Sequence, residues 1–197
     1  MLAFEQTGQM LATLKEWHLD EPITSQRGAK FLPLKCRGSS VTTTVGTKDS
    51  PVRSPFGATN FSDESSARKT LEFSLEAEQQ AEWEAVTTHM RNYLLENSER
   101  LFKKKMTAAS LQENFRAPVQ QKGDYKPLLR CKITTNAVRC WDEHGNRVDL
   151  PEDLRNVPVA VKLAVERVWM MSKEMGLVLS VTDIQLCSEP APDGCPF

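Results

Sequence analysis

The sequence predicts a mainly β protein with attached α-helices: a small antiparallel barrel with a helical insert between two of its strands. Three observations lead to this prediction. The chain carries one long hairpin pattern, it has about seven segments with strand character, and these segments do not alternate with helices as they would in a parallel sheet.

The hairpin pattern covers residues 157–186. Apolar side chains alternate with others over 157–165, which indicates a strand with one buried face, and a second apolar run follows a polar turn at 172–176. The alternation changes phase at Glu166-Arg167 and again at Thr182-Asp183. One extra residue in a strand is a β-bulge, which bends and twists it. Two bends in a long hairpin favour a small closed barrel over a flat sheet.

The elements before the hairpin follow from local patterns. Residues 1–28 have weak helical spacing and form an N-terminal arm in this prediction. Two strands over 30–45 are joined around Gly38, and a loop rich in Gly, Ser and Pro follows over 46–69. Alternating apolar side chains over 70–75 then predict a third strand.

A helical insert follows over about residues 76–116. Trp83, Val86, Met90 and Leu94 recur at steps of three and four, which predicts an amphipathic helix with Trp83 in the core. The insert ends before the next strand pattern.

Strand patterns return after the insert. Leu129, Cys131 and Ile133 occupy alternate positions and should point to one face. A second hairpin joins residues 138–141 to 147–150 through a loop that contains glycine.

The chain of 197 residues is long enough for one good core with appendages, and we expect one domain. We divide it into the arm 1–28, the domain 29–187 and a C-terminal tail 188–197. No apolar run reaches about 18 residues, and the N-terminal residues lack the pattern of a signal peptide. We therefore expect a soluble intracellular protein without membrane contact, located in the nucleus or at a viral replication site if it is viral.

The five cysteines show no paired spacing, so neither a disulfide framework nor a zinc site is predicted. Nucleophile motifs and phosphate-binding glycine loops are absent from the sequence as well. We expect no cofactor and no enzymatic activity. An enzyme whose residues the sequence does not reveal is the weakest alternative.

Basic side chains gather in parts of the chain although the net charge is −1. One group lies in the first strands and their loop, another around the strand at 128–134, and acidic side chains gather on the helix. A barrel with one cationic face can follow a phosphate backbone while its total charge stays near zero. An equally weighted alternative is that any protein with 25 basic residues shows such groups.

Two tryptophans each follow an arginine at a distance of two positions, namely Trp141 after Arg139 and Trp169 after Arg167. Aromatic rings in a cationic groove stack the bases of single strands. A tryptophan on a strand is more often part of the core, and for Trp169 the bulge at Glu166-Arg167 decides which face it takes. The predicted nucleic-acid-binding residues are Lys35, Arg37, Arg130, Lys132, Arg139, Trp141, Lys162, Arg167 and Trp169.

Several short sequence motifs and predicted elements occur in a characteristic order along residues 29–187: Ser54-Pro55-Phe56-Gly57, the strand 70–75, the helix with Trp83, Tyr125-Lys126-Pro127-Leu128-Leu129, Trp141-Asp142-Glu143-His144-Gly145, Val168-Trp169, Gly176-Leu177 and Asp183-Ile184-Gln185-Leu186. In this order they resemble the OB-fold single-stranded-DNA-binding proteins of large eukaryotic DNA viruses and of T7-type phages. The resemblance implies an OB-like fold and the coating of single-stranded DNA during replication or recombination.

T7-type members end in a strongly acidic tail closed by an aromatic residue, which engages replication partners and competes with DNA. Residues 188–197 end in Phe197 but carry only two acidic side chains, Glu189 and Asp193, and so depart from that pattern. The resemblance implies docking of replication proteins through this tail. A homodimer is a further partner that we leave open.

The leading hypothesis is therefore non-enzymatic binding of single-stranded DNA with low sequence preference. The rival hypothesis is a β-rich structural or protein-interaction module, for example a virion component, whose cationic face meets an acidic protein.

Overall fold

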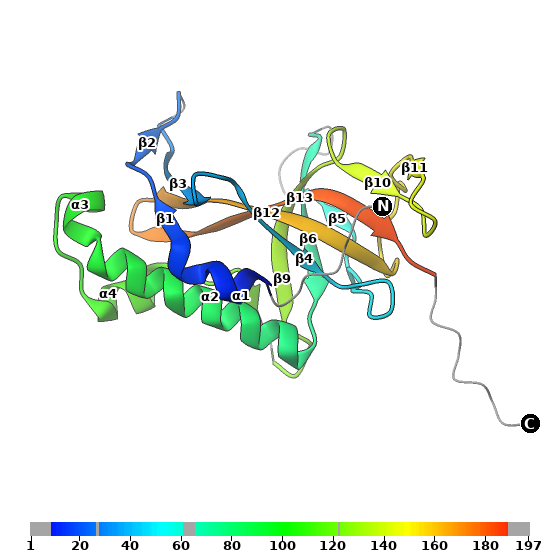
Figure 1. Ribbon diagram of the computed structural model, residues 1–197, viewed down its shortest axis with the longest axis horizontal. Helices are drawn as coiled ribbons and strands as arrows, with labels where there is room; N and C mark the ends of the chain where they lie inside the picture. The colour runs from blue at the N-terminus through cyan, green and yellow to red at the C-terminus, as the bar shows by residue number, and fades with distance from the viewer. Residues whose placement is uncertain (1–8, 27, 61–65, 122, 189–197) are drawn as a thin grey trace, which may run out of the picture.

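The computed structural model describes residues 9–26, 28–60, 66–121 and 123–188, and residues 1–8, 27, 61–65, 122 and 189–197 lie outside the description (Figure 1). The N-terminal elements are α1 (Gln9–Thr13), the 3-10 turn η1 (Leu14–Glu16), β1 (Trp17–Leu19), β2 (Ile23–Thr24), β3 (Lys30–Cys36), β4 (Val41–Val45), β5 (Ala58–Thr59) and β6 (Arg68–Ser74). The helices α2 (Ala77–Glu96), α3 (Ser98–Phe102) and α4 (Ala108–Asn114) follow. The remaining strands are β7 (Phe115–Arg116), β8 (Val119–Gln120), β9 (Leu128–Thr134), β10 (Arg139–Trp141), β11 (Arg147–Val148), β12 (Val159–Met171) and β13 (Glu174–Leu186).

The long hairpin β12–β13 is the centre of the sheet, and both predicted bulges are present. Lys162 pairs with Asp183 while Leu163 pairs with Val181, so Thr182 is the extra residue in β13. Val165 pairs with Leu179 while Arg167 pairs with Val178, so Glu166 is the extra residue in β12. The turn is shorter than predicted, because Ser172 adopts a left-handed conformation with φ 54° and lets two residues connect the strands.

The bulge at Glu166 lies where β12 changes its partner. Before the bulge β12 pairs with β4 over Val161–Val165, and after it β12 pairs with β3 over Arg167–Met170. The far part of the hairpin extends toward the helices on the left of Figure 1, beside β3. The bend therefore separates the compact end of the sheet from a long hairpin arm.

The predicted class, a mainly β and OB-like fold with a helical insert between strands, is confirmed. Two details differ from the prediction. Strand β13 pairs in parallel with β7, β9 and β10, so the sheet is mixed. The pairings among the described residues also do not close into a complete barrel. Parallel pairing joins strands distant in the chain, which local periodicity does not indicate.

The helix α2 buries the face that the sequence predicted. Trp83 is 2 % exposed and lies in the core with Val86, Met90 and Leu94. The helix begins with a capping box, in which the Glu76 side chain accepts from a backbone N–H and the Gln79 side chain accepts from that of Glu76. At the end of the insert, β7 pairs with β13 and so joins the insert to the hairpin arm.

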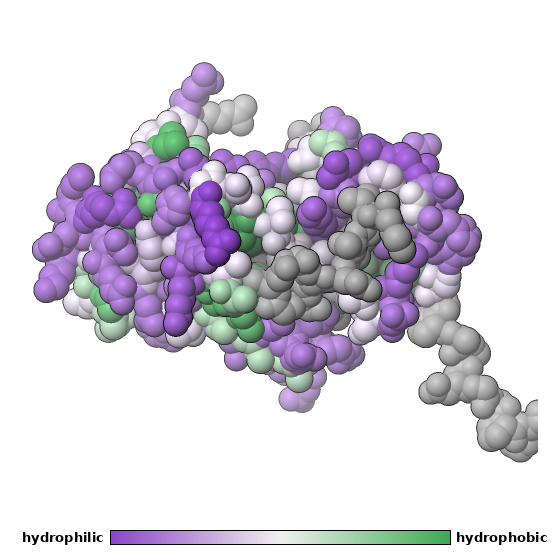
Figure 2. Space-filling view, viewed as in Figure 1, coloured by the Kyte–Doolittle hydropathy of each residue, from purple (hydrophilic) through white to green (hydrophobic). Residues whose placement is uncertain are grey.

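The described part of the N-terminal segment docks on the same core. Met10, Leu14, Trp17 and Leu19 are buried, and β1 pairs with β3. Figure 2 shows a mostly hydrophilic face with scattered apolar spots, one of them near β2, where Ile23 is exposed. None of the described helices is both long and apolar enough to span a membrane.

Candidate nucleic-acid interface

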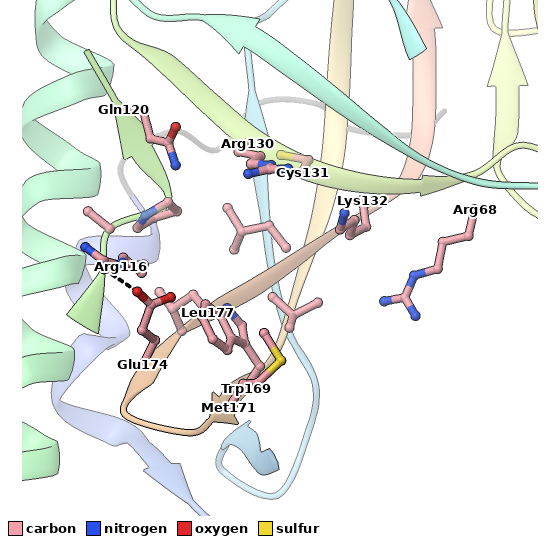
Figure 3. A pocket seen from close by; sticks show the side chains of 14 residues that line it. Arg68, Arg116, Gln120, Arg130, Cys131, Lys132, Trp169, Met171, Glu174 and Leu177 are labelled. Atoms are coloured by element: carbon pink, nitrogen blue, oxygen red, sulfur yellow. Dashed lines mark hydrogen bonds and ion pairs between the residues drawn. The ribbon is translucent and has the colours of Figure 1, made fainter. Parts of the chain in front are cut away.

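An open groove of ≈ 610 Å³ lies on the outer face of the sheet (Figure 3). Strands β6, β9, β12 and β13 form its floor and walls, and β7 with the following residues 117–120 forms one end. In Figure 3, Arg130, Lys132 and Arg68 lie on one side of the space, and Trp169 and Met171 lie on the other.

Strand register brings the basic side chains of the groove together. Leu129, Cys131 and Ile133 of β9 are buried, as their alternation predicted, so Arg130 and Lys132 point outward. Lys132 lies opposite Thr70 of β6 and Ser180 of β13. Since directly opposed residues share a face, the outward side chains of these three strands line one surface.

Lys132 lies in a cluster of cations. Its Nζ donates to Thr70 Oγ1 at 2.9 Å. Burial lowers the pKa of Lys132, and the positive charges of Arg130 and Arg68 lower it further, while Glu72 acts in the opposite direction. The Nε of Arg130 lies 3.7 Å from Glu72 Oε1. These neighbouring positive charges repel one another, and an anion bound between them would relieve the repulsion.

Trp169 faces the groove because of the bulge at Glu166. Its neighbour Val168 is fully buried, whereas Trp169 is half-buried and lines the groove. Gly176 lies opposite Trp169 across the hairpin. A Cβ atom at Gly176 would be 2.9 Å from Trp169 Nε1, so the indole lies directly against the strand where a side chain is missing.

A second aromatic ring adjoins this position. Phe31 of β3 is the partner of Trp169 on the other side of β12, and the Arg167 guanidinium lies 4.8 Å from the Phe31 ring centroid. This distance is within the range of a cation–π contact. Arg167 also forms an ion pair with Glu166 at 2.9 Å. Phe31 was absent from the predicted site, since only the pairing of β3 with the bulged arm places it there.

One end of the groove carries an ion pair between Arg116 of β7 and Glu174 of β13 (Figure 3). The hydrogen bond from Arg116 is the main reason that the pKa of Glu174 lies below its usual value. Neither residue, nor Arg68, was among the predicted site residues. Arg68 lies at the end of the predicted loop 46–69, and Arg116 lies at the end of the helical insert. No local sequence pattern therefore indicates that the two residues share a groove.

Arg139 and Trp141 lie elsewhere, around the buried carboxylate of Asp183. Arg139 Nε is 2.7 Å from Asp183 Oδ1, and Trp141 Nε1 donates to the same oxygen at 3.2 Å. Burial alone would raise the pKa of Asp183, but hydrogen bonds from Arg139, Thr182 and Trp141 together hold it below the usual value. Arg147 lies 5.6 Å from the Trp141 ring. This cluster holds β10 against β13.

The remaining predicted residues also lie outside the groove lining. Lys35 Nζ is 2.9 Å from Asp20 Oδ2, and Arg37 pairs with Glu16. Both pairs connect β3 with the segment that contains β1. Lys162 lies on β12 between Thr44 of β4 and Asp183 of β13. The structure thus gathers Arg130, Lys132 and Trp169 from the predicted set, with Arg167 beside them, and a nucleic-acid contact remains a prediction for every member.

Within the described ranges, no group of three His, Cys, Asp or Glu side chains is arranged to hold a metal ion. Cys36, Cys131, Cys140 and Cys187 are free thiols. Cys131 borders the groove from the core side, and burial raises its pKa strongly. It remains a thiol rather than a reactive thiolate.

Comparison with known proteins identifies the fold. No family model matches the sequence, and no curated protein matches it. The fold is similar to that of gp2.5, a single-stranded DNA binding protein encoded by bacteriophage T7, with a TM-score of 0.53 and 9% identity over 80% of this chain and 92% of that chain. The single-stranded DNA-binding protein from bacteriophage Enc34 in complex with ssDNA gives a TM-score of 0.48 and 7% identity over 88% of this chain and 98% of that chain.

A second structure of the single-stranded DNA-binding protein from bacteriophage Enc34 gives a TM-score of 0.48 and 6% identity, over 91% of this chain and 94% of that chain. The predicted resemblance to the T7-type phage proteins is therefore confirmed as a resemblance of fold. At such low identity the similarity is one of fold and does not transfer individual site residues.

Proposed function

We propose that the groove binds single-stranded DNA with little sequence preference, and that the protein acts by binding rather than by catalysis. One observation carries the proposal: Trp169 shares a single open groove with Arg68, Arg130 and Lys132. Aromatic rings for stacking and cations for phosphates are the two components that sequence-independent single-strand binding requires.

The geometry favours single strands over duplexes. A base must be unpaired and unstacked before its face can lie on the indole of Trp169, and every base has such a face. The cations on the opposite side of the groove can then neutralise the backbone of the same strand. The fold shared with gp2.5 supports this proposal.

We further propose a role in DNA replication or recombination, which would place the protein inside the cell where single strands arise. Residues 189–197, with Phe197, lie outside the described residues. The docking of replication proteins through Phe197 therefore stays a prediction, as do the domain boundaries 1–28, 29–187 and 188–197 and the homodimer.

Tryptophan fluorescence tests the proposal. Oligo-dT should quench the emission at low salt, and a duplex with the same number of phosphates should quench it much less. Trp17 and Trp83 are buried and Trp141 lies outside the groove lining, so the change should come mainly from Trp169 and should be much smaller in Trp169→Phe. Anisotropy of labelled oligo-dT then reports whether that variant still binds.

The rival hypothesis, a protein-interaction module with an acidic protein partner, predicts a different order of affinities. Poly-glutamate should bind as well as oligo-dT of equal charge if the cationic groove meets acidic proteins. Tight oligo-dT binding with weak poly-glutamate binding supports the proposal, and the reverse result contradicts it.

A further inference from the structure

Glu174 is the one carboxylate among the described residues that line the groove. It is the first residue of β13, directly after the two-residue turn of the hairpin. Arg116 lies on β7, which pairs in parallel with β13 through Met175 with Phe115 and Gly176 with Arg116. The backbone of both strands therefore holds the carboxylate and the guanidinium together at the groove end.

Arg116 also adjoins the stacking position. A Cβ atom at Gly176 would lie 2.8 Å from the carbonyl oxygen of Arg116 and 2.9 Å from Trp169 Nε1, so Arg116 and the indole border the same glycine. A nucleotide stacked on Trp169 would therefore lie beside the strand that carries the Arg116 side chain. In the free protein that side chain is bound to Glu174.

We infer that Glu174 is an internal competitor for phosphate, which occupies Arg116 until single-stranded DNA displaces it. The inference rests on the proposed function and concerns the regulation of its affinity. A carboxylate and a phosphodiester both offer anionic oxygens to a guanidinium, so they compete for the same donors.

The pair is open enough to exchange. The side chains of Arg116 and Glu174 are 55% and 44% exposed, and exposed ion pairs are weak against water and salt. The pKa of Glu174 is held low by Arg116, so its carboxylate is charged at neutral pH and the competition is present under ordinary conditions. Glu174 thereby limits the affinity of the groove instead of creating it.

The test measures oligo-dT affinity of Glu174→Gln by anisotropy at about 50 and 200 mM salt. The variant should bind more tightly than the wild type, because Arg116 becomes free for a phosphate. Its log–log salt slope should steepen by about 0.7, so its advantage should shrink about 2.6-fold over this fourfold rise in salt. Glu174→Ala should behave in the same way, which excludes an effect of the new amide.

Two controls make the result specific. Glu21→Gln removes the carboxylate of a comparable exposed pair, Glu21 with Arg100, which lies outside the groove lining. It reports the general effect of losing one negative charge and should change affinity much less. Arg116→Ala should cancel the gain when it is combined with Glu174→Gln.

The outcomes separate the inference from the proposed function. If the wild type binds and Glu174→Gln binds equally or more weakly, the inference is wrong and the function stands. An equal gain in Glu21→Gln, or a gain that survives Arg116→Ala, also overturns the inference. Binding by neither wild type nor variant overturns both, and binding by the variant alone supports both.

Discussion

Trp169 and Gly176 lie directly opposite each other across the hairpin, and the indole occupies the space that a side chain at Gly176 would fill. The φ angle of Gly176 is not in the left-handed region, so residues other than glycine could adopt the same backbone conformation. The glycine is needed for room: a Cβ atom there would be 3.2 Å from Trp169 Cε2 as well as 2.9 Å from Nε1.

The nearest atom to that Cβ is the Arg116 carbonyl oxygen at 2.8 Å, so Gly176→Ala must displace both the β7 backbone and the indole. It should therefore weaken oligo-dT binding. If the substitution acts through the ring, its effect should disappear in a Trp169→Ala background, because effects at contacting residues are not additive. Anisotropy of the two single variants and the double variant measures this. Simple addition of the two losses would contradict a positioning role for Gly176.

Trp169→Ala should reduce oligo-dT affinity by about 1–3 kcal/mol, the usual contribution of one stacked base. Trp141→Ala provides the contrast, since the Trp141 ring is tied to Asp183 outside the groove lining. It should lower the denaturation midpoint and leave affinity nearly unchanged. A loss of affinity in Trp141→Ala as large as that in Trp169→Ala would place the stacking site elsewhere.

The salt dependence should identify the cationic face. Arg130→Ala with Lys132→Ala should reduce the log–log salt slope of oligo-dT binding by about 1.4, which is about 0.7 for each of two phosphate contacts. Lys35→Ala with Arg37→Ala should leave the slope unchanged, because Asp20 and Glu16 already bind these side chains away from the groove. Equal slopes in the two double variants would refute this assignment.

Lys132 should give the binding a pH dependence. Burial and the neighbouring arginines place its pKa below the ordinary lysine value in the free protein. A bound phosphate favours the charged form and raises that pKa, so binding takes up a proton at pH values between the two. Affinity should therefore fall as the pH rises through the pKa of Lys132 in the free protein.

Lys132→Arg provides the control for this pH dependence, because a guanidinium stays charged throughout that range. Oligo-dT affinity of the variant, measured over the same alkaline series, should fall much less than that of the wild type. Parallel curves for both proteins would show that Lys132 is not the titrating group.

Asp183→Asn should destabilise the fold without changing the groove. The Asp183 side chain is 1% exposed, and Arg139 Nη2 and Thr182 Oγ1 donate to its Oδ2 at 2.8 and 3.0 Å. Loss of the charge-assisted bonds should cost about 1–3 kcal/mol of unfolding free energy, measured by chemical denaturation. Unchanged oligo-dT affinity in the folded variant would confirm that this cluster is structural, and a large loss of affinity would contradict it.

The same carboxylate should contribute to acid sensitivity. The folded-state pKa of Asp183 is lowered, so its stabilisation is complete above the pKa of the unfolded chain and is lost as the pH falls through the folded-state pKa. Asp183→Asn lacks this titration. Its stability should therefore vary less than that of the wild type in acid, and identical acid curves would oppose this attribution.

The sequence by itself determined the alternation of the core, the face of α2 and the two bulges. Each depends on the period of a single segment, and a change of parity at Glu166 or Thr182 is visible without knowing the partner strand. For this reason the bulge that turns Trp169 toward the groove could be predicted. The parallel pairing of β13 could not, since it joins distant segments.

Only the tertiary structure decided which charged residues share a surface. Lys35, Arg37 and Arg139 resemble Arg130 and Lys132 in the sequence, but nearby carboxylates bind the first three outside the groove lining. Strand register and β7, which follows the helical insert, bring Arg68, Arg116 and Glu174 into the groove lining. The pairing of β3 with β12 places Phe31 beside it. Charge and aromatic character are properties of single residues, whereas a binding groove depends on distances between strands, and long-range pairing sets those distances.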